Sequence, residues 1–131
     1  MKTAAIILAA GQGTRMKSGR AKVLHTLGGR PIIRYVIDQA LALKADPVIV
    51  VVGHQGEQVI EYSEQVYGHR VQFVWQKEQL GTAHAVMQAK KALSGFDGQV
   101  IILYGDVPLL GVETTRELVR KVRRTRPLLV F

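Results

Sequence analysis

The feature that most constrains the fold is the alternation of short apolar runs with longer segments of helical periodicity. Four runs are rich in Val and Ile, the composition of strands buried on both faces of a sheet. They cover Ala4–Ala9, Val48–Val52, Val71–Trp75 and Val100–Tyr104. Apolar residues recur at helical spacing after Pro31, around Val59, and from Ala83 to Leu93. This alternation predicts an α/β fold with a three-layer, open, mostly parallel, Rossmann-like sheet and right-handed crossovers.

The loops that follow the predicted strands are where a ligand is expected. In an open α/β sheet, ligands bind beyond the carboxyl ends of the strands, at the point where the strand order reverses. The loops concerned are residues 10–24, 53–57, 76–82 and 105–110. The last residues, Pro127–Phe131, look like the start of a further strand. We therefore expect residues 1–131 to form the N-terminal portion of one larger domain.

Composition excludes several kinds of site. The chain has no cysteine, which removes disulfides and cysteine-ligated zinc, and its four histidines lack the i,i+4 pairing of a helical metal site. No run reaches the roughly 18 apolar residues that a membrane-spanning helix needs. The start, Met1-Lys2-Thr3, lacks a signal-peptide pattern. We expect a cytoplasmic protein with no membrane span.

The net charge of +8 is concentrated late in the sequence. Residues 116–126 carry six basic side chains and one acid, Glu117. A basic run on a predicted helix is typical of a solvated face, although it also raises a nucleic-acid-binding domain as an alternative. Because the bases gather on one helix without interleaved aromatic side chains, we expect no nucleic-acid partner.

A glycine-rich motif follows the first predicted strand and spans Leu8–Met16. Its glycines let the backbone wrap closely, so that N–H groups can point at phosphate oxygens. Arg15 and Lys22 add a bidentate cation and a point-charge cation to the same loop. A dinucleotide-binding motif is disfavoured because Met16 replaces its third glycine, and no Walker A sequence is present. The motif favours a polyphosphate site over an ordinary strand-to-helix glycine turn.

Asp106 stands at the end of the last predicted strand, within Tyr104-Gly105-Asp106-Val107-Pro108. Magnesium in nucleotide enzymes is held by one or two carboxylates together with substrate phosphates. Asp106 is therefore a candidate Mg²⁺ ligand, with a second ligand expected from elsewhere. The alternative is that it caps the turn before Pro108.

Several motifs together resemble one family of enzymes. The matching blocks are Leu8–Met16, Lys22–His25, Val52–His54, Gln76–Ala85 and Leu103–Leu109. In this order they resemble the bifunctional N-acetylglucosamine-1-phosphate uridyltransferase and glucosamine-1-phosphate acetyltransferase family of bacteria. The resemblance runs from Ala5 to about Arg120. Ala21 departs from it, because related signatures often have proline there.

The resemblance implies transfer of a uridylyl group from UTP to N-acetylglucosamine-1-phosphate, giving UDP-N-acetylglucosamine, a cell-wall and lipopolysaccharide precursor, and pyrophosphate. It implies Mg²⁺ as cofactor, with Asp106 as its ligand and with Arg15, Lys22 and Asp106 as catalytic residues. The nucleotide and substrate contacts that it implies are Leu8, Ala9, Ala10, Gly11, Gly13, Arg15, Lys22, Gln76, Gly81, Thr82, Tyr104, Gly105 and Asp106.

The same resemblance implies that important parts of the family's enzyme lie beyond residue 131. These are the second magnesium ligand, much of the acceptor-sugar pocket and the β-helix acetyltransferase domain, through which the full-length protein forms a homotrimer. We expect the 131 residues alone to be inactive. Two alternatives stay open: a nucleotidyltransferase for another base or sugar phosphate, and a non-catalytic nucleotide-binding module.

Overall fold

A four-stranded parallel sheet forms the centre of the molecule. The computed structural model describes residues 2–11, 19–107, 116–117 and 120–121. Its strands are β1 (Lys2–Ala9), β4 (Val48–Val52), β5 (Gln72–Trp75) and β6 (Gly98–Tyr104), in the order β5-β4-β1-β6. In the register of the sheet, Ile7 of β1 lies opposite Val50 of β4 and Leu103 of β6. The four strands predicted from the sequence are confirmed.

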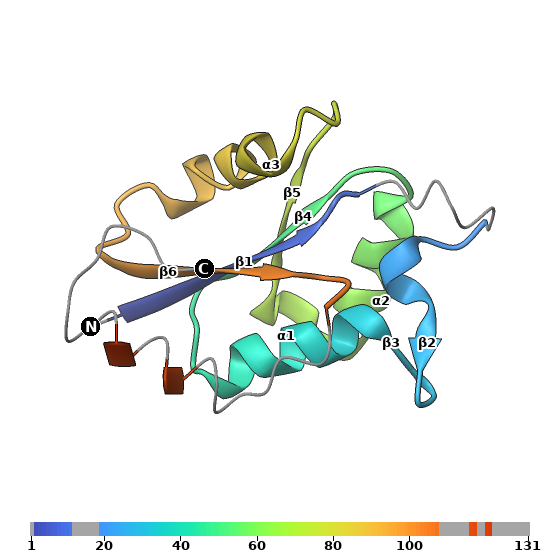
Figure 1. Ribbon diagram of the computed structural model, residues 1–131, viewed down its shortest axis with the longest axis horizontal. Coiled ribbons are helices and arrows are strands. Elements are labelled where there is room, and N and C mark those ends of the chain that lie inside the picture. The colour runs from blue at the N-terminus through green and yellow to red at the C-terminus, as the bar shows by residue number, and fades with distance from the viewer. Residues whose placement is uncertain (1, 12–18, 108–115, 118–119, 122–131) are drawn as a thin grey trace.

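Helices cover both faces of the sheet and complete three layers (Figure 1). On one face lie α1 (Ile32–Ala42) and α2 (Gly56–Tyr67), and on the other lies α3 (Thr82–Gln88). Successive side chains of a strand point to opposite faces, so Ile7 packs in the cluster under α1 and α2, whereas Ile6 packs under α3. All five residues of β4 are buried. The predicted α/β architecture is thus confirmed.

A small hairpin between β1 and α1 was not expected from the sequence. Its strands are β2 (Thr26–Leu27) and β3 (Arg30–Pro31), and they pair in antiparallel fashion. The two residues between them, Gly28 and Gly29, have positive φ angles of 61° and 83°. A two-residue hairpin turn of this hand requires such angles, which glycine adopts without steric cost.

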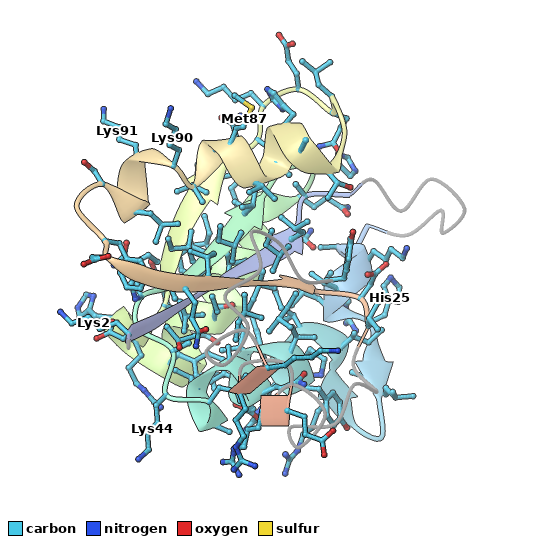
Figure 2. All side chains as sticks on the ribbon, turned by 60° about the vertical axis from the view of Figure 1, so that its left-hand side comes forward. Lys2, His25, Lys44, Met87, Lys90 and Lys91 are labelled. Atoms are coloured by element: carbon cyan, nitrogen blue, oxygen red, sulfur yellow. The ribbon has the colours of Figure 1, made fainter. Side chains whose placement is uncertain are left out.

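The helical segment expected from Ala83 to Leu93 is interrupted. Helix α3 ends at Gln88, and Leu93 belongs to a separate 3-10 turn, η3 (Lys91–Leu93). The chain tightens at Ala89, whose N–H donates to the carbonyl of Val86 three residues back. Met87, on the outer side of α3, is 64% exposed and points away from the sheet, as do Lys90 and Lys91 (Figure 2).

Two further 3-10 turns are η1 (Lys22–Leu24) and η2 (Gly68–Arg70). The strand expected at Pro127–Phe131 and most of the basic segment 116–126 lie outside the described residues. Among the residues that are described, no helix has the length and apolar character needed to cross a membrane.

A partly buried hydrogen bond links the two helices of one layer. The hydroxyl of Tyr67, at the end of α2, donates to Oδ1 of Asp38 on α1 at 2.6 Å. The Tyr67 side chain packs in the same apolar cluster as Ile37 and Val59. Burial, together with the hydrogen bond to Asp38, raises the pKa of Tyr67 above its ordinary value.

Removing the Tyr67 hydroxyl tests this contact. We expect Tyr67→Phe to lower the free energy of unfolding by about 1–2 kcal/mol, because the hydrogen bond from the buried tyrosine to the charged Asp38 carboxylate is lost. Urea unfolding would measure the change. Tyr35→Phe is the control, since it removes an exposed hydroxyl that donates to the Leu27 carbonyl at 2.5 Å. Equal losses in the two variants would contradict the role of Tyr67.

The raised pKa of Tyr67 also predicts a pH effect. A tyrosine whose folded pKa exceeds its unfolded value of about 10 stabilises the protein below that pH, and this stabilisation is lost as the pH rises. Stability should therefore fall above about pH 10, and less steeply in Tyr67→Phe.

Candidate functional site

The order of the strands reverses at β1, and the reversal creates the candidate site. After β1 the chain moves outward to β4 and then β5, and it next returns to place β6 on the other side of β1. The loops after β1 and β6 therefore begin side by side, beyond the carboxyl ends of the two strands, and the gap between them is the candidate site. The carboxyl ends of both strands point to the right in Figure 1.

A pocket of about 340 Å³ lies at these carboxyl ends. Its walls come from the β1 loop, the start of η1, the segment between β5 and α3, and the end of β6. The lining residues are Leu8, Ala9, Ala10, Gly11, Lys22, Val23, Gln76, Gln79, Gly81, Thr82, Ala85, Tyr104 and Asp106.

Most of the residues singled out in the sequence meet at this pocket. Of the thirteen candidate site residues, ten line it, and Gly105 lies beside it with its N–H donating to the Leu8 carbonyl at 2.9 Å. Gly13 and Arg15 lie outside the described residues. Sequence reasoning missed Val23, Gln79 and Ala85, although each is close in the sequence to a residue that it did identify.

An ion pair joins the two loops across the gap. Nζ of Lys22 lies 3.1 Å from Oδ2 of Asp106, and the side chains are 43% and 38% exposed. A pair this exposed contributes little to stability, because water screens it. Its importance is positional, since it holds one cation and one carboxylate side by side at the pocket.

Two glycines allow the walls of the pocket to approach each other closely. A Cβ added to Gly105 would lie 3.0 Å from the Leu8 carbonyl oxygen, so β6 could not end as near to β1. A Cβ on Gly53, just after β4, would lie 2.9 Å from both the Ala10 carbonyl oxygen and Nε2 of Gln79. Larger residues at either position would push the loops apart.

Helix α2 anchors the segment that leads into Lys22. The amide of Gln58 accepts a hydrogen bond from the N–H of Ala21 through Oε1 and donates one to the carbonyl of Gly19 through Nε2, each at 2.7 Å. One side chain thus satisfies both a donor and an acceptor of an irregular backbone segment. Sequence periodicity gave no sign of this contact.

Gln76 forms part of the wall opposite the ion pair and is only 3% exposed. Its backbone N–H donates to the Val52 carbonyl at 2.7 Å, which fixes the end of β5 to β4. Its side-chain Nε2 lies 3.2 Å from the carbonyl oxygen of Gly81 and 3.0 Å from Nδ1 of His84. The amide is therefore held rigidly.

The chemistry available at the pocket is that of a site for an anionic ligand with a metal ion. Lys22 supplies a positive charge and Asp106 a carboxylate. Among the described residues there is no group of three or more His, Asp or Glu side chains that could hold a metal by itself. A metal at Asp106 would need ligands from elsewhere, such as the oxygens of a bound phosphate.

Comparison with solved structures shows the fold. A Bacillus anthracis protein named as a glucose-1-phosphate thymidylyltransferase superposes with a TM-score of 0.76 at 20% sequence identity, over 91% of this chain and 50% of that one. The fold is that of the nucleotide-diphospho-sugar transferases.

The sequence then identifies the family. The chain belongs to the MobA-like NTP transferase domain family, which matches residues 5–131. It is 52% identical to the bifunctional protein GlmU of Thermus thermophilus over 118 residues, and 54% identical to that of an Anaeromyxobacter species over 124 residues. These alignments cover 90% and 94% of this chain and 25% of each GlmU. The chain thus spans about a quarter of the length of these relatives and matches their N-terminal part.

The Gln58 contact gives a prediction about the backbone before Lys22. Gln58→Met keeps the length of the side chain but leaves the N–H of Ala21 without its acceptor. We expect hydrogen exchange of the Ala21 amide to accelerate by about tenfold or more, corresponding to loss of at least about 1.4 kcal/mol of local protection. Gln65→Met is the matched control on the exposed face of the same helix. Unchanged exchange at Ala21 would show that Gln58 does not anchor the segment.

Proposed function

We propose that this chain supplies the nucleotide-binding part of an enzyme that transfers a uridylyl group from UTP to N-acetylglucosamine-1-phosphate. The products are UDP-N-acetylglucosamine and pyrophosphate. Nucleotidyl transfer to a sugar phosphate follows from the family and its GlmU relatives. The observation that carries the proposal is the placement of Lys22 beside Asp106 in the pocket at the strand-order reversal.

Each wall of the pocket has a part in this proposal. The residues from Leu8 to Gly11, with Gly13, pack around the nucleotide, and Lys22 and Arg15 bind its phosphates. Gln76, Gly81 and Thr82 contact the uracil base on the opposite wall. Tyr104, Gly105 and Asp106 lie along the phosphates that join nucleotide and sugar. A volume of about 340 Å³ is at the small end of the range for ligand pockets, about 300–1,000 Å³.

The donor set fits a magnesium ion that arrives with a triphosphate. Asp106 offers a partly exposed carboxylate, and Mg²⁺ prefers one or two carboxylates plus phosphate oxygens and water. When bound, Mg²⁺ neutralises charge on the reacting phosphates. Asp106 would hold the cation of a metal–triphosphate and Lys22 would bind its phosphate oxygens, so each member of the ion pair would have a new partner.

The chemistry requires little beyond positioning and charge stabilisation. A phosphate oxygen of the sugar phosphate attacks the α-phosphorus of UTP in line, and the bond to pyrophosphate breaks. The attacking phosphate is already ionised near neutral pH, so no general base is needed. Lys22 and Arg15 stabilise the charge spread over the transferring oxygens.

Only part of that enzyme is present in 131 residues. We propose that the chain binds UTP but does not complete the reaction by itself, because the resemblance implies that much of the acceptor-sugar pocket and the second magnesium ligand lie beyond residue 131. Acetyl transfer and assembly into a homotrimer would belong to that remainder, and the reaction would take place in the cytoplasm. A nucleotidyltransferase for another base or sugar phosphate is the second candidate, favoured by the fold shared with the thymidylyltransferase.

Calorimetric titration of UTP with Mg²⁺ into the folded chain tests the nucleotide site. We expect saturable binding, weakened by about tenfold or more in Lys22→Ala, because a charge-assisted contact to phosphate is lost. Lys90→Ala removes the same charge from the surface beyond α3 and should leave binding unchanged. If the folded wild-type chain binds no UTP, or if both variants bind alike, the assignment of Lys22 is wrong.

Asp106→Asn tests the proposed metal contact separately from the phosphate contacts. We expect the gain in UTP affinity on adding Mg²⁺ to shrink by at least about tenfold, the scale on which metal sites respond to a lost partner. Binding in EDTA should be undiminished, because the amide no longer neutralises Lys22. Asp97→Asn, at the opposite end of β6, is the matched control. A full Mg²⁺ effect in Asp106→Asn would remove Asp106 from the metal site.

A further inference from the structure

A short hydrogen-bond network lies behind the wall formed by Gln76. Nε2 of Gln76 is 3.2 Å from the Gly81 carbonyl oxygen and 3.0 Å from Nδ1 of His84 on α3. A carbonyl oxygen can only accept, so the group facing it must be the NH₂ end of the amide. Gly81 therefore determines which way the amide of Gln76 is turned.

The hydrogen bonds of the Gln76 amide within the protein leave one of its atoms for a ligand. An amide NH₂ has two hydrogens, and here each has an acceptor within the protein, the carbonyl oxygen of Gly81 and Nδ1 of His84. Gln76 lines the pocket but is only 3% exposed, so its amide has little room to exchange partners with water. The atom that remains for a ligand is Oε1, which can only accept.

This count holds only if Nδ1 of His84 carries a lone pair, and a second amide competes for the ring. Nε2 of Gln88 lies 3.2 Å from Nε2 of His84 and donates to the His84 carbonyl at 2.9 Å. A neutral imidazole has one acceptor nitrogen, so only one of the two amides can donate to it. Gln76 is the closer to the ring and the more enclosed, whereas Gln88 is half-buried and can turn toward water. Burial therefore favours a lone pair on Nδ1 and a hydrogen on Nε2.

We propose that His84 is a positioning residue for base selection: its Nδ1 holds the Gln76 amide so that the pocket presents an acceptor to the base. The inference rests on the proposed function and deepens it. Uracil carries an N–H donor at ring position 3, whereas cytosine has an acceptor there. A fixed acceptor at Gln76 favours uracil over cytosine. An amide that is free to rotate could form a hydrogen bond with either base.

Nucleotide selectivity in three His84 variants tests the role. We expect His84→Ala to lower the preference of the chain for UTP over CTP by roughly fivefold or more, the effect of about one hydrogen bond. His84→Asn places Oδ1 the same number of bonds from the backbone as Nδ1 and should restore the preference. His84→Gln places its acceptor one bond further and should not. Gln88→Ala, which frees the other ring nitrogen, should leave selectivity as in the wild type.

Calorimetry with each nucleotide and Mg²⁺, on variants shown to be folded by circular dichroism, gives these ratios. An unchanged UTP:CTP ratio in folded His84→Ala, or restoration by Gln but not by Asn, would overturn the proposal. A loss of selectivity in Gln88→Ala equal to that in His84→Ala would also overturn it, because selectivity would then depend on the contact between His84 and Gln88.

The protonation state of the ring is measurable without any nucleotide. In a chain labelled with ¹⁵N-histidine, two-bond ¹⁵N–¹H correlations distinguish a protonated from an unprotonated ring nitrogen, and the His84→Asn spectrum assigns the His84 signals. We expect an unprotonated Nδ1 and a protonated Nε2 near neutral pH. A proton on Nδ1 contradicts the role of His84 whatever the chain binds. A chain that binds no UTP contradicts the proposed function instead, so the two failures are distinguishable.

Discussion

Strand β1 is hydrogen-bonded along both edges, to β4 on one side and to β6 on the other, and the candidate site depends on this double pairing. Because the chain reaches β4 first and β6 last, the carboxyl ends of β1 and β6 lie side by side where the strand order reverses, and a gap opens beyond them. The loop after β1 borders this gap from one side and Asp106 from the other.

The sheet was predictable because its strands carry the plainest signal in the sequence. Val48–Val52 is apolar throughout, and such a run has few alternatives to a strand buried on both faces. The hairpin before α1 was missed, although the pair Gly28-Gly29 is a recognisable hairpin signal. The end of α3 could not be predicted, because Met87 and Leu93 fit helical spacing whether the helix continues or tightens into a 3-10 turn.

The candidate site was predictable to the extent that motifs follow strands. The carboxyl end of a strand determines which edge of the sheet a loop occupies, so Lys22, Gln76 and Asp106 could be assigned to the same pocket. What could not be predicted depends on packing between distant elements. The ion pair of Lys22 with Asp106 requires the strand order, and Val23 of η1 and Ala85 of α3 line the pocket because these elements pack beside it. Arg15 and Gly13 lie outside the described residues, and their roles stay predictions.

The segment between β5 and α3, which contacts the base in the proposed function, is anchored at both of its ends. Gln76 begins it with a backbone hydrogen bond to Val52 of β4, and Gly81 closes it by accepting the first hydrogen bond of α3, from Ala85. Between these two residues lie four others that belong to no strand or helix. Because the segment is fixed only at its two ends, the corresponding residues of a relative could be grafted in place of residues 77–80 without disturbing the apolar layers. In the proposed function, substitutions at these four positions would reshape the wall beside Gln76, while the sheet stays the same.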